Sequence, residues 1–242
     1  MDIKCYLAMT AAEFAAAAVM PGHMAWMACH FSSYGTGLSN LPRKLPEGSM
    51  VIVNDRTPPN GHDPDLITQQ LLQLAQEQSI ACFLLDFQRS DMEENLRLAQ
   101  QLTRDLPYPV GVTELYAKAL DCAVFLSAPA PHCALETHLA PWAGREIWLE
   151  AAIETEQVTV TERGSKFVHL PDTDLTEPVF LEDTLHCRYR IDLMEDRVVF
   201  TLRRGRQEAA ALLAQAQKLG VNQAVGLYQQ LGKEYSNEPT EL

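Results

Sequence analysis

Four acidic residues follow directly on apolar stretches of the sequence, where a carboxylate needs a partner, a ligand or a shifted pKa to offset the cost of burial. These residues and the stretches before them are Asp55 after 50–54, Asp86 after 80–85, Glu114 after 110–113 and Glu150 after 147–149. Short apolar stretches separated by helical segments are typical of parallel strands buried on both faces. Because the carboxyl ends of such strands line the ligand site of α/β folds, we expect the carboxylates to gather at one rim. Gathered carboxylates whose pKa values differ can act as an acid and as a base or nucleophile.

Asp86 is the leading candidate among the four. In the segment 84–89, the period-two alternation of a strand places Leu84, Asp86 and Gln88 on one side, so a carboxylate and an amide are expected to share the barrel mouth. We assign Asp86 to catalysis, and Gln88 and Arg89 to substrate binding. The alternative is that Asp86 accepts hydrogen bonds from the following loop or pairs with Arg89.

The other three carboxylates each have a structural alternative. Asp55 opens a loop rich in turn residues, where an Asx turn before a proline would also explain it. Glu114 suits the first turn of a helix, which the helix dipole favours without any chemistry. Glu150 shares a side of its strand with Trp148, and a tryptophan beside a carboxylate predicts a sugar platform, although tryptophan is commoner in a core.

Two loops supply further candidates for substrate binding. His62 lies in the loop that follows Asp55, and the segment from His30 to Gly37, which includes Tyr34, is a small, polar, glycine-containing loop after an apolar strand. We assign His30, Tyr34 and His62 to binding, with a surface hydrogen bond as the alternative for His62. The loop lacks the glycine patterns that hold nucleotide phosphates.

No metal or cofactor is predicted. The sequence has no H-E-x-x-H, and His132, Cys133 and His138 lack a recognised zinc-ligand spacing. There is no G-x-S-x-G either, so a nucleophilic serine is disfavoured.

The composition limits the class of partner. The 242 residues carry a net charge of -13, which works against binding to nucleic acid or to anionic membrane surfaces. A neutral or cationic small molecule fits better, and a carbohydrate is the partner that we predict. The six cysteines include no Cys-x-x-Cys, and Asp2 and Glu13 interrupt the apolar start, so we expect a cytoplasmic protein. The oligomeric state stays open.

The order of predicted elements favours an α/β protein with a (β/α) TIM-barrel-like fold, irregular or incomplete, with antiparallel hairpins in the second half. Strands are predicted at 3–8, 24–29, 50–54, 80–86, 110–113, 122–127 and 146–151, and helices at 11–19, 64–78, 91–104, 114–120, 206–218 and 221–232. Hairpins are predicted at 158–170 and 187–203. We expect one domain over 1–242, with a regular part to about 156 and a hairpin and helical part over about 157–235.

One short segment resembles a known family. Residues 83–88 resemble the fourth-strand signature of chitinase-like glycoside hydrolases, a (β/α) barrel family whose motif reads D-x-x-D-x-D-x-E. On that pattern Asp86 stands at the last aspartate and Gln88 at the catalytic acid, while Ala81 and Leu84 replace the two earlier aspartates. The resemblance covers this strand and the rhythm of the barrel.

The resemblance implies one of two outcomes. Either the acid has shifted to Glu114 or Glu150, or the barrel binds sugar without cleaving it, because the amide of Gln88 cannot donate the proton that a glycosidic leaving group needs.

Three functional hypotheses follow, and the sequence leaves open whether the protein is an enzyme. The first is a glycosidase-type barrel that acts on or binds a carbohydrate or similar polyol through the four carboxylates. The second is a non-catalytic ligand-binding or scaffold protein on a degenerate barrel. A lesser third is a metal-assisted hydrolase that uses Asp55, His62 and Asp86.

Overall fold

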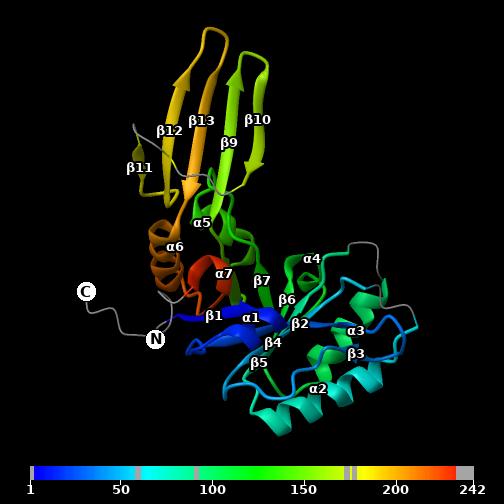
Figure 1. Ribbon diagram of the computed structural model, residues 1–242. Helices are drawn as coiled ribbons and strands as arrows, with labels where there is room; N and C mark the ends of the chain where they lie inside the picture. Colours follow the sequence, from blue (N-terminus) through cyan, green and yellow to red (C-terminus); the bar gives the residue numbers. More distant parts are fainter. Residues whose placement is uncertain (1–2, 58–60, 90–92, 172–174, 176–178, 233–242) are drawn as a thin grey trace. The chain divides into compact units, whose positions relative to one another are not determined.

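The computed structural model describes residues 3–57, 61–89, 93–171, 175 and 179–232. These residues form two compact units. One unit holds 4–126, 144–150 and the segment that begins at 223, and the other holds 127–143 and 151–222. The first unit is a barrel, and the second is built on an antiparallel sheet (Figure 1).

Eight parallel strands close the barrel in the order β1-β2-β4-β5-β6-β7-β8-β14, with β14 hydrogen-bonded to β1. Their bounds are β1 Lys4–Met9, β2 Met24–Phe31, β4 Met50–Asn54, β5 Cys82–Asp86, β6 Val110–Thr113, β7 Ala123–Leu126, β8 Ile147–Ala151 and β14 Gln223–Leu227. A short strand, β3 (Leu38–Ser39), runs antiparallel to β2. Closure removes the free strand edges that an open sheet would expose.

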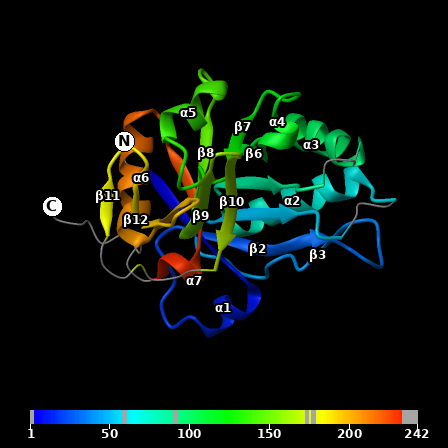
Figure 2. The same ribbon diagram turned by 90° about the horizontal axis from the view of Figure 1, so that it is seen from above.

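The barrel strands are buried on both faces, as their unbroken apolar stretches predict. The helices of this unit are α1 Ala11–Ala16, α2 Pro64–Gln78, α3 Glu93–Asp105, α4 Glu114–Ala117 and α7 Tyr228–Leu231. Helices α2 and α3 lie outside the barrel, and their apolar faces join the outward residues of β4 and β5 in one core (Figures 1 and 2). None of the helices in the described part of the chain has the length and apolar character needed to cross a membrane.

Helix α2 begins where the sequence predicts it. The carboxylate of Asp63 accepts hydrogen bonds from the backbone N–H groups of Asp65, at 3.0 Å, and Leu66, at 3.3 Å. Pro64 fills the first turn, where its missing N–H costs nothing. The cap fixes the end of the loop that runs from β4 into this helix.

Alternate residues of the strands fill the inside of the barrel. The interior cluster includes Ile52, Leu84, Phe125 and Trp148. Trp148 has no exposed surface, and its indole covers the backbone of β6 at Gly111. A β-carbon at Gly111 would lie 2.3 Å from Cε3 of Trp148, so the barrel interior requires glycine at this position.

The second unit contains the chain that runs between β8 and β14, together with residues 127–143 of the connection between β7 and β8. Its antiparallel sheet has the strand order β10-β9-β13-β12-β11, so β10 and β11 are the edge strands. The bounds are β9 Glu154–Thr161, β10 Gly164–Leu170, β11 Phe180–Glu182, β12 Cys187–Leu193 and β13 Val198–Arg204, and the helices are α5 Leu135–Leu139, η1 Ala140–Trp142 and α6 Arg206–Lys218.

Opposite residues of an antiparallel sheet share a face, so the register assigns the side chains of this sheet to two faces. One face carries a row of apolar residues, with Val158, Phe167, Ile191 and Phe200 in register. Of these, Phe167 and Ile191 are exposed. At the corresponding row of the other face, Gln157 is in register with Val168 and Thr201, and Thr201 with Arg190.

Arg204 anchors the inner end of β13. Its side chain is fully buried, its Nη1 donates to the carbonyl of Pro129, and its Nη2 donates to the carbonyl of Leu185 at 3.4 Å. Nη1 also lies 3.5 Å from a carboxylate oxygen of Glu154, which offsets part of the cost of burying the guanidinium.

The structure confirms the barrel, both hairpins and all seven predicted barrel strands. The helix predicted at 221–232 is wrong in its first half, because Gln223–Leu227 forms β14, the strand that closes the barrel. Burial of Ala224 and Val225 between two parallel neighbours outweighs helix propensity there. The irregularity of the barrel therefore lies in the inserted sheet and in the short helices α4 and α7.

We expect the substitution Gly111→Ala to destabilise the barrel, because the added methyl group must displace the indole of Trp148. Overpacking of this kind costs about 1–3 kcal/mol, measurable as a lower urea midpoint. Gly35→Ala is the matched control, since a β-carbon there meets its nearest neighbour, Ser32 Oγ, at an ordinary 3.6 Å. In a Gly111→Ala, Trp148→Leu double mutant, the loss in free energy of unfolding should be smaller than the sum of the losses in the two single mutants. A loss equal to that sum would contradict the contact between Gly111 and the indole of Trp148.

Candidate functional site

The carboxyl ends of β4 and β5 bring polar side chains together at the mouth of the barrel. Asn54, the last residue of β4, is in register with Asp86, the last residue of β5. Asp86 is half-buried and follows the interior residue Leu84 by two positions, so it points to the inside of the barrel as predicted. The side-chain amide of Gln88 donates a hydrogen bond to Asp86 Oδ1, which makes these two side chains one unit.

The surroundings of Asp86 raise the pKa of its carboxyl above the ordinary value. Burial is the largest cause, because it disfavours the charged form, and the negative charge of Asp55 acts in the same direction. The hydrogen bond from Gln88 and the positive charge of Arg56 oppose the shift. Asp86 is therefore a carboxyl group that takes up a proton more readily than an exposed aspartate.

Asp55 is committed to holding the chain after β5. Only 3% of its surface is exposed. Its Oδ1 accepts from the backbone N–H of Gln88, and its Oδ2 accepts from the backbone N–H of Arg89, both at 3.0 Å. Oδ2 also accepts from the side-chain amide of Asn95 at 2.8 Å. Three donors on one buried carboxylate make Asp55 a positioning residue for Gln88.

Neighbouring side chains fix the same segment from the other side. Thr113 Oγ1 donates to the carbonyl of Phe87 at 2.8 Å, and the hydroxyl of Tyr116 donates to the carbonyl of Arg89. Asn95 contacts this hydroxyl at 3.4 Å. The segment 87–89 is thus held by β4, α3, β6 and α4 at once, and we call these bonds the Asp55 clamp.

Asn54 shapes the mouth next to the clamp. Its side-chain amide donates to the carbonyls of Met27, at 3.2 Å, and Cys29, at 2.9 Å, on the neighbouring strand β2. The register between β2 and β4 shifts between Trp26 and Cys29, and the amide bridges that irregularity.

The remaining predicted acids lie on other elements. Glu114 is exposed at the first position of α4, which suits a first-turn acid. Glu150 is half-buried near the end of β8, two residues after Trp148. The role of Trp148 as a sugar platform is corrected: it has no exposed surface and fills the barrel interior, and its Nε1 donates to Glu146 at 3.1 Å.

The predicted binding residues of the loops have mostly structural contacts. His30 lies on β2, with Nδ1 2.8 Å from the carbonyl of Phe31 and Nε2 3.0 Å from the side-chain amide of Asn40. His62 Nε2 lies 3.1 Å from the carbonyl of Ser32. Tyr34 is fully exposed. The side chain of Arg89 is exposed, while its backbone belongs to the Asp55 clamp.

The described residues contain no group of three or more histidine, cysteine or acidic side chains arranged to hold a metal ion. Asp55 in particular has its oxygens engaged by three donors, so a metal-assisted reaction through Asp55, His62 and Asp86 has no support in the geometry.

Sequence reasoning missed the polar residues that build the clamp, namely Asn54, Asn95, Thr113 and Tyr116. A signal exists for Asn54 and Thr113, because each ends a buried strand with a polar residue, as Asp86 does. Asn95 and Tyr116 are interior positions of helical segments, where single polar residues carry no such signal.

Solved structures with a similar fold include three proteins. Chitinase ChiW from Paenibacillus sp. str. FPU-7 is 10% identical, with a TM-score of 0.59 over 94% of this chain and 41% of that chain. A mutant of the GH18 chitinase from Cycas revoluta, in complex with (GlcNAc)4, is 10% identical, with a TM-score of 0.54 over 92% and 94% of the two chains. The spore cortex-lytic enzyme SleL of Bacillus cereus is 11% identical, with a TM-score of 0.50 over 96% and 71%.

The chain has the fold of chitinase-like barrels. No protein-family model and no curated protein matches its sequence.

Within this chitinase-like barrel, β5 is the fourth barrel strand, which is the strand on which the D-x-x-D-x-D-x-E resemblance was found. Gln88 stands at the position of the catalytic acid in that motif and donates to Asp86, which stands at its last aspartate. An amide N–H can donate a hydrogen bond, but it cannot transfer a proton to a leaving group. The arrangement at β5 can therefore bind hydroxyl and amide groups without supplying an acid at this position.

We expect Asp55→Ala to lower the free energy of unfolding by about 2–4 kcal/mol, because it leaves two backbone N–H groups and the Asn95 amide without their buried acceptor. Hydrogen exchange at the Gln88 and Arg89 amides should accelerate more than exchange in α2. Asp63→Asn is the control: asparagine caps a helix as well as aspartate does, so stability should hardly change. Unchanged exchange at Gln88 in Asp55→Ala would contradict the clamp.

We expect the stability of the Asp86→Asn variant, relative to the parent, to increase with pH. The folded state binds the proton of Asp86 more tightly than the unfolded chain does, so ionisation of Asp86 costs stability as the pH rises from the unfolded pKa of about 3.9 through the raised folded pKa. Urea unfolding on both sides of this range measures the difference. Asp105→Asn should show the opposite trend, because Arg104 lowers the pKa of Asp105. A pH-independent difference for Asp86→Asn would disprove the shift.

Proposed function

We propose that this protein binds a neutral saccharide at the mouth of its barrel without cleaving it. The observation that carries the proposal is the pair formed by Gln88 and Asp86 at the end of β5, where the motif of the chitinase-like fold calls for a proton donor. Without that donor the leaving group of a glycosidic bond has no acid at this position.

The Asp86–Gln88 pair suits saccharide recognition. The free oxygen lone pairs of Asp86 accept from sugar hydroxyl or N-acetyl N–H groups, and the amide oxygen of Gln88 offers a second acceptor close by. The Asp55 clamp holds the backbone of Gln88, so little conformational entropy is lost when a ligand binds. The net charge of -13 further favours a neutral ligand over an acidic one.

The fold neighbours indicate which sugar to test first. The Cycas revoluta chitinase was solved in complex with (GlcNAc)4, and its fold covers 92% of this chain. We therefore take (GlcNAc)4 as the first probe for this barrel.

One observation favours a second candidate, a glycosidase in which Asp86 itself is the acid. Burial raises the pKa of its carboxyl, which is the direction of shift that a general acid needs. In that case Gln88 would orient Asp86, and Glu150 or Glu114 would act as the second carboxylate. Product formation separates the two candidates.

The test is titration calorimetry with (GlcNAc)4, combined with mass spectrometry of the sugar after long incubation. We expect binding with no shorter product. Asp86→Ala should weaken binding about tenfold or more, equivalent to ~1.4 kcal/mol. Gln88→Ala should weaken it less, because Asp86 keeps its own acceptors. Glu195→Gln, in an exposed turn of the other unit, is the control with unchanged affinity.

Shorter products that vanish in Asp86→Asn would establish the glycosidase instead. Absence of binding to chitooligosaccharides, and equally to a panel of other neutral oligosaccharides, would disprove a saccharide function for the barrel mouth.

A further inference from the structure

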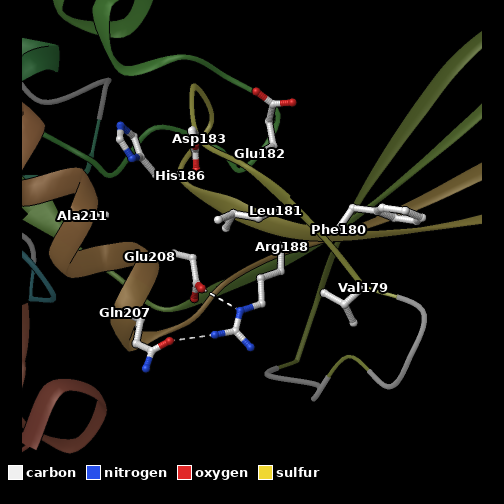
Figure 3. A pocket seen from close by; sticks show the side chains of 10 residues that line it. All are labelled: Val179, Phe180, Leu181, Glu182, Asp183, His186, Arg188, Gln207, Glu208 and Ala211. Carbon is white, nitrogen blue, oxygen red and sulfur yellow. Dashed lines mark hydrogen bonds and ion pairs between the residues drawn. The ribbon is translucent and has the colours of Figure 1, made fainter.

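A cavity lies within the unit that carries the antiparallel sheet. Its volume is about 510 Å³, within the range of small-molecule sites. The walls come from the edge strand β11, the start of β12 and the first turns of α6 (Figure 3). None of these residues belongs to the barrel mouth, so the cavity is separate from the site described above.

One wall of the cavity is apolar and open to solvent. Phe180 is 49% exposed and Leu181 is 65% exposed, although both are large apolar residues on an edge strand. Leu181 points toward α6, where Ala211 also lines the cavity, while Phe180 points away from the helix (Figure 3). Phe180 stacks on Tyr189 at 5.4 Å between ring centroids, on the face of the strand pair opposite to Leu181 and Arg188. Exposed apolar surface beside a cavity is typical of a binding site.

Hydrogen bonds fix the side chain of Arg188 through two of its three nitrogen atoms. Its Nε donates to Glu208 at 2.7 Å and its Nη2 donates to Gln207 at 2.8 Å, as the dashed lines in Figure 3 show. Glu208 is itself fixed, because its other oxygen accepts from the backbone N–H of Gly205 at 3.0 Å. Two bonds therefore set the plane of the guanidinium, and the Nη1 group has no partner among the described residues. A guanidinium oriented in this way is ready to donate to a ligand.

Other polar groups of the same cavity also have no hydrogen-bond partner among the described residues. Neither the side-chain NH2 of Gln207 nor the imidazole of His186 has a hydrogen-bond partner among the described residues, and the same holds for the carboxylate of Asp183. Burial is the largest cause that lowers the pKa of His186, which favours the neutral ring with one donor and one acceptor. Three donors and two acceptors thus converge on one space.

The charges of the cavity select the class of ligand. The charge of Glu208 is compensated by Arg188, while Glu182 and Asp183 have no cation paired with them in the described residues. The remaining charge is negative, so an anionic ligand is disfavoured even though an arginine is present. A neutral molecule with many hydroxyl groups and an apolar face uses the donors, the acceptors and the apolar side chains of Leu181 and Ala211 together.

We propose that the cavity between β11 and α6 is a second binding site, and that its ligand is a neutral mono- or disaccharide or a similar polyol. Donors on Arg188 and Gln207 bind hydroxyl oxygens, the carboxylate of Asp183 accepts from hydroxyl groups, and the apolar wall covers the C–H face of the ring. This site does not depend on the function proposed for the barrel mouth.

The experiment follows the imidazole C–H signal of His186 by NMR during titration with N-acetylglucosamine, glucose, myo-inositol and glucuronate. His186→Asn assigns the signal, since asparagine tolerates the left-handed backbone at this position, where φ is 49°. We expect a saturable shift with at least one neutral probe, and binding of glucuronate at least about fivefold weaker than glucose because of the negative charge.

Variants test the residues. Asp183→Asn and Leu181→Ser, both at exposed positions, should each weaken the binding of the neutral probe about fivefold or more. Asp183→Asn should also reduce the difference in affinity between glucose and glucuronate. Glu195→Gln is the matched control with unchanged binding. The same titration in the Asp86→Ala background should leave the His186 shift intact, which separates this site from the barrel mouth.

Three results would overturn the proposal. The first is a His186 signal that none of the neutral probes shifts, whatever happens at the barrel. The second is tighter binding of glucuronate than of glucose in the parent protein. The third is a shift caused by a lysine-rich peptide alone, which would show that the edge of β11 takes a peptide strand instead.

Discussion

The candidate site depends on one buried carboxylate. Asp55 directly follows β4, yet two of its three hydrogen bonds go to the backbone just beyond β5 and the third goes to α3. A carboxylate buried without donors would be costly, and a chain segment at the end of a strand would be mobile without acceptors. The hydrogen bonds between them satisfy the carboxylate and fix the position of the segment. The position of Gln88, and therefore of the hydrogen bond that it gives to Asp86, follows from this exchange.

The clamp also makes the framework independent of the side chain at position 88. The side chain of Gln88 takes no part in the clamp, because only its backbone N–H is bound by Asp55. Glutamate and glutamine at this position would use the same backbone bond, so the chemistry of the side chain can change while the framework stays. What changes is the partner of Asp86: a glutamine donates to it, whereas an ionised glutamate would repel it.

The sequence predicted the barrel well because its strands are buried on both faces and separated by helices, which leaves unbroken apolar stretches such as 50–54. It failed at β14, where Gln223–Leu227 is short, contains a glycine and follows a helix, so that nothing local distinguishes it from a helical turn. Its strand conformation comes from pairing with β1, more than 200 residues away in the chain. Asp55 shows a second limit: a carboxylate at the end of a strand has the same sequence signature whether it serves a ligand or holds a neighbouring loop.

The antiparallel sheet gives another example of what the sequence alone does not predict. Arg188 and Gln207 are 19 residues apart, and each looks like an ordinary exposed polar residue in the sequence. The hairpin register places Arg188 opposite Arg203, just before the turn into α6, and this brings its guanidinium within reach of the first turn of the helix. The edge position of β11 then leaves Leu181 uncovered beside it. A cavity with a fixed donor and an apolar wall thus arises from strand register, which only the folded chain reveals. At the barrel mouth and in this cavity alike, a backbone or side-chain anchor fixes the orientation of a polar group.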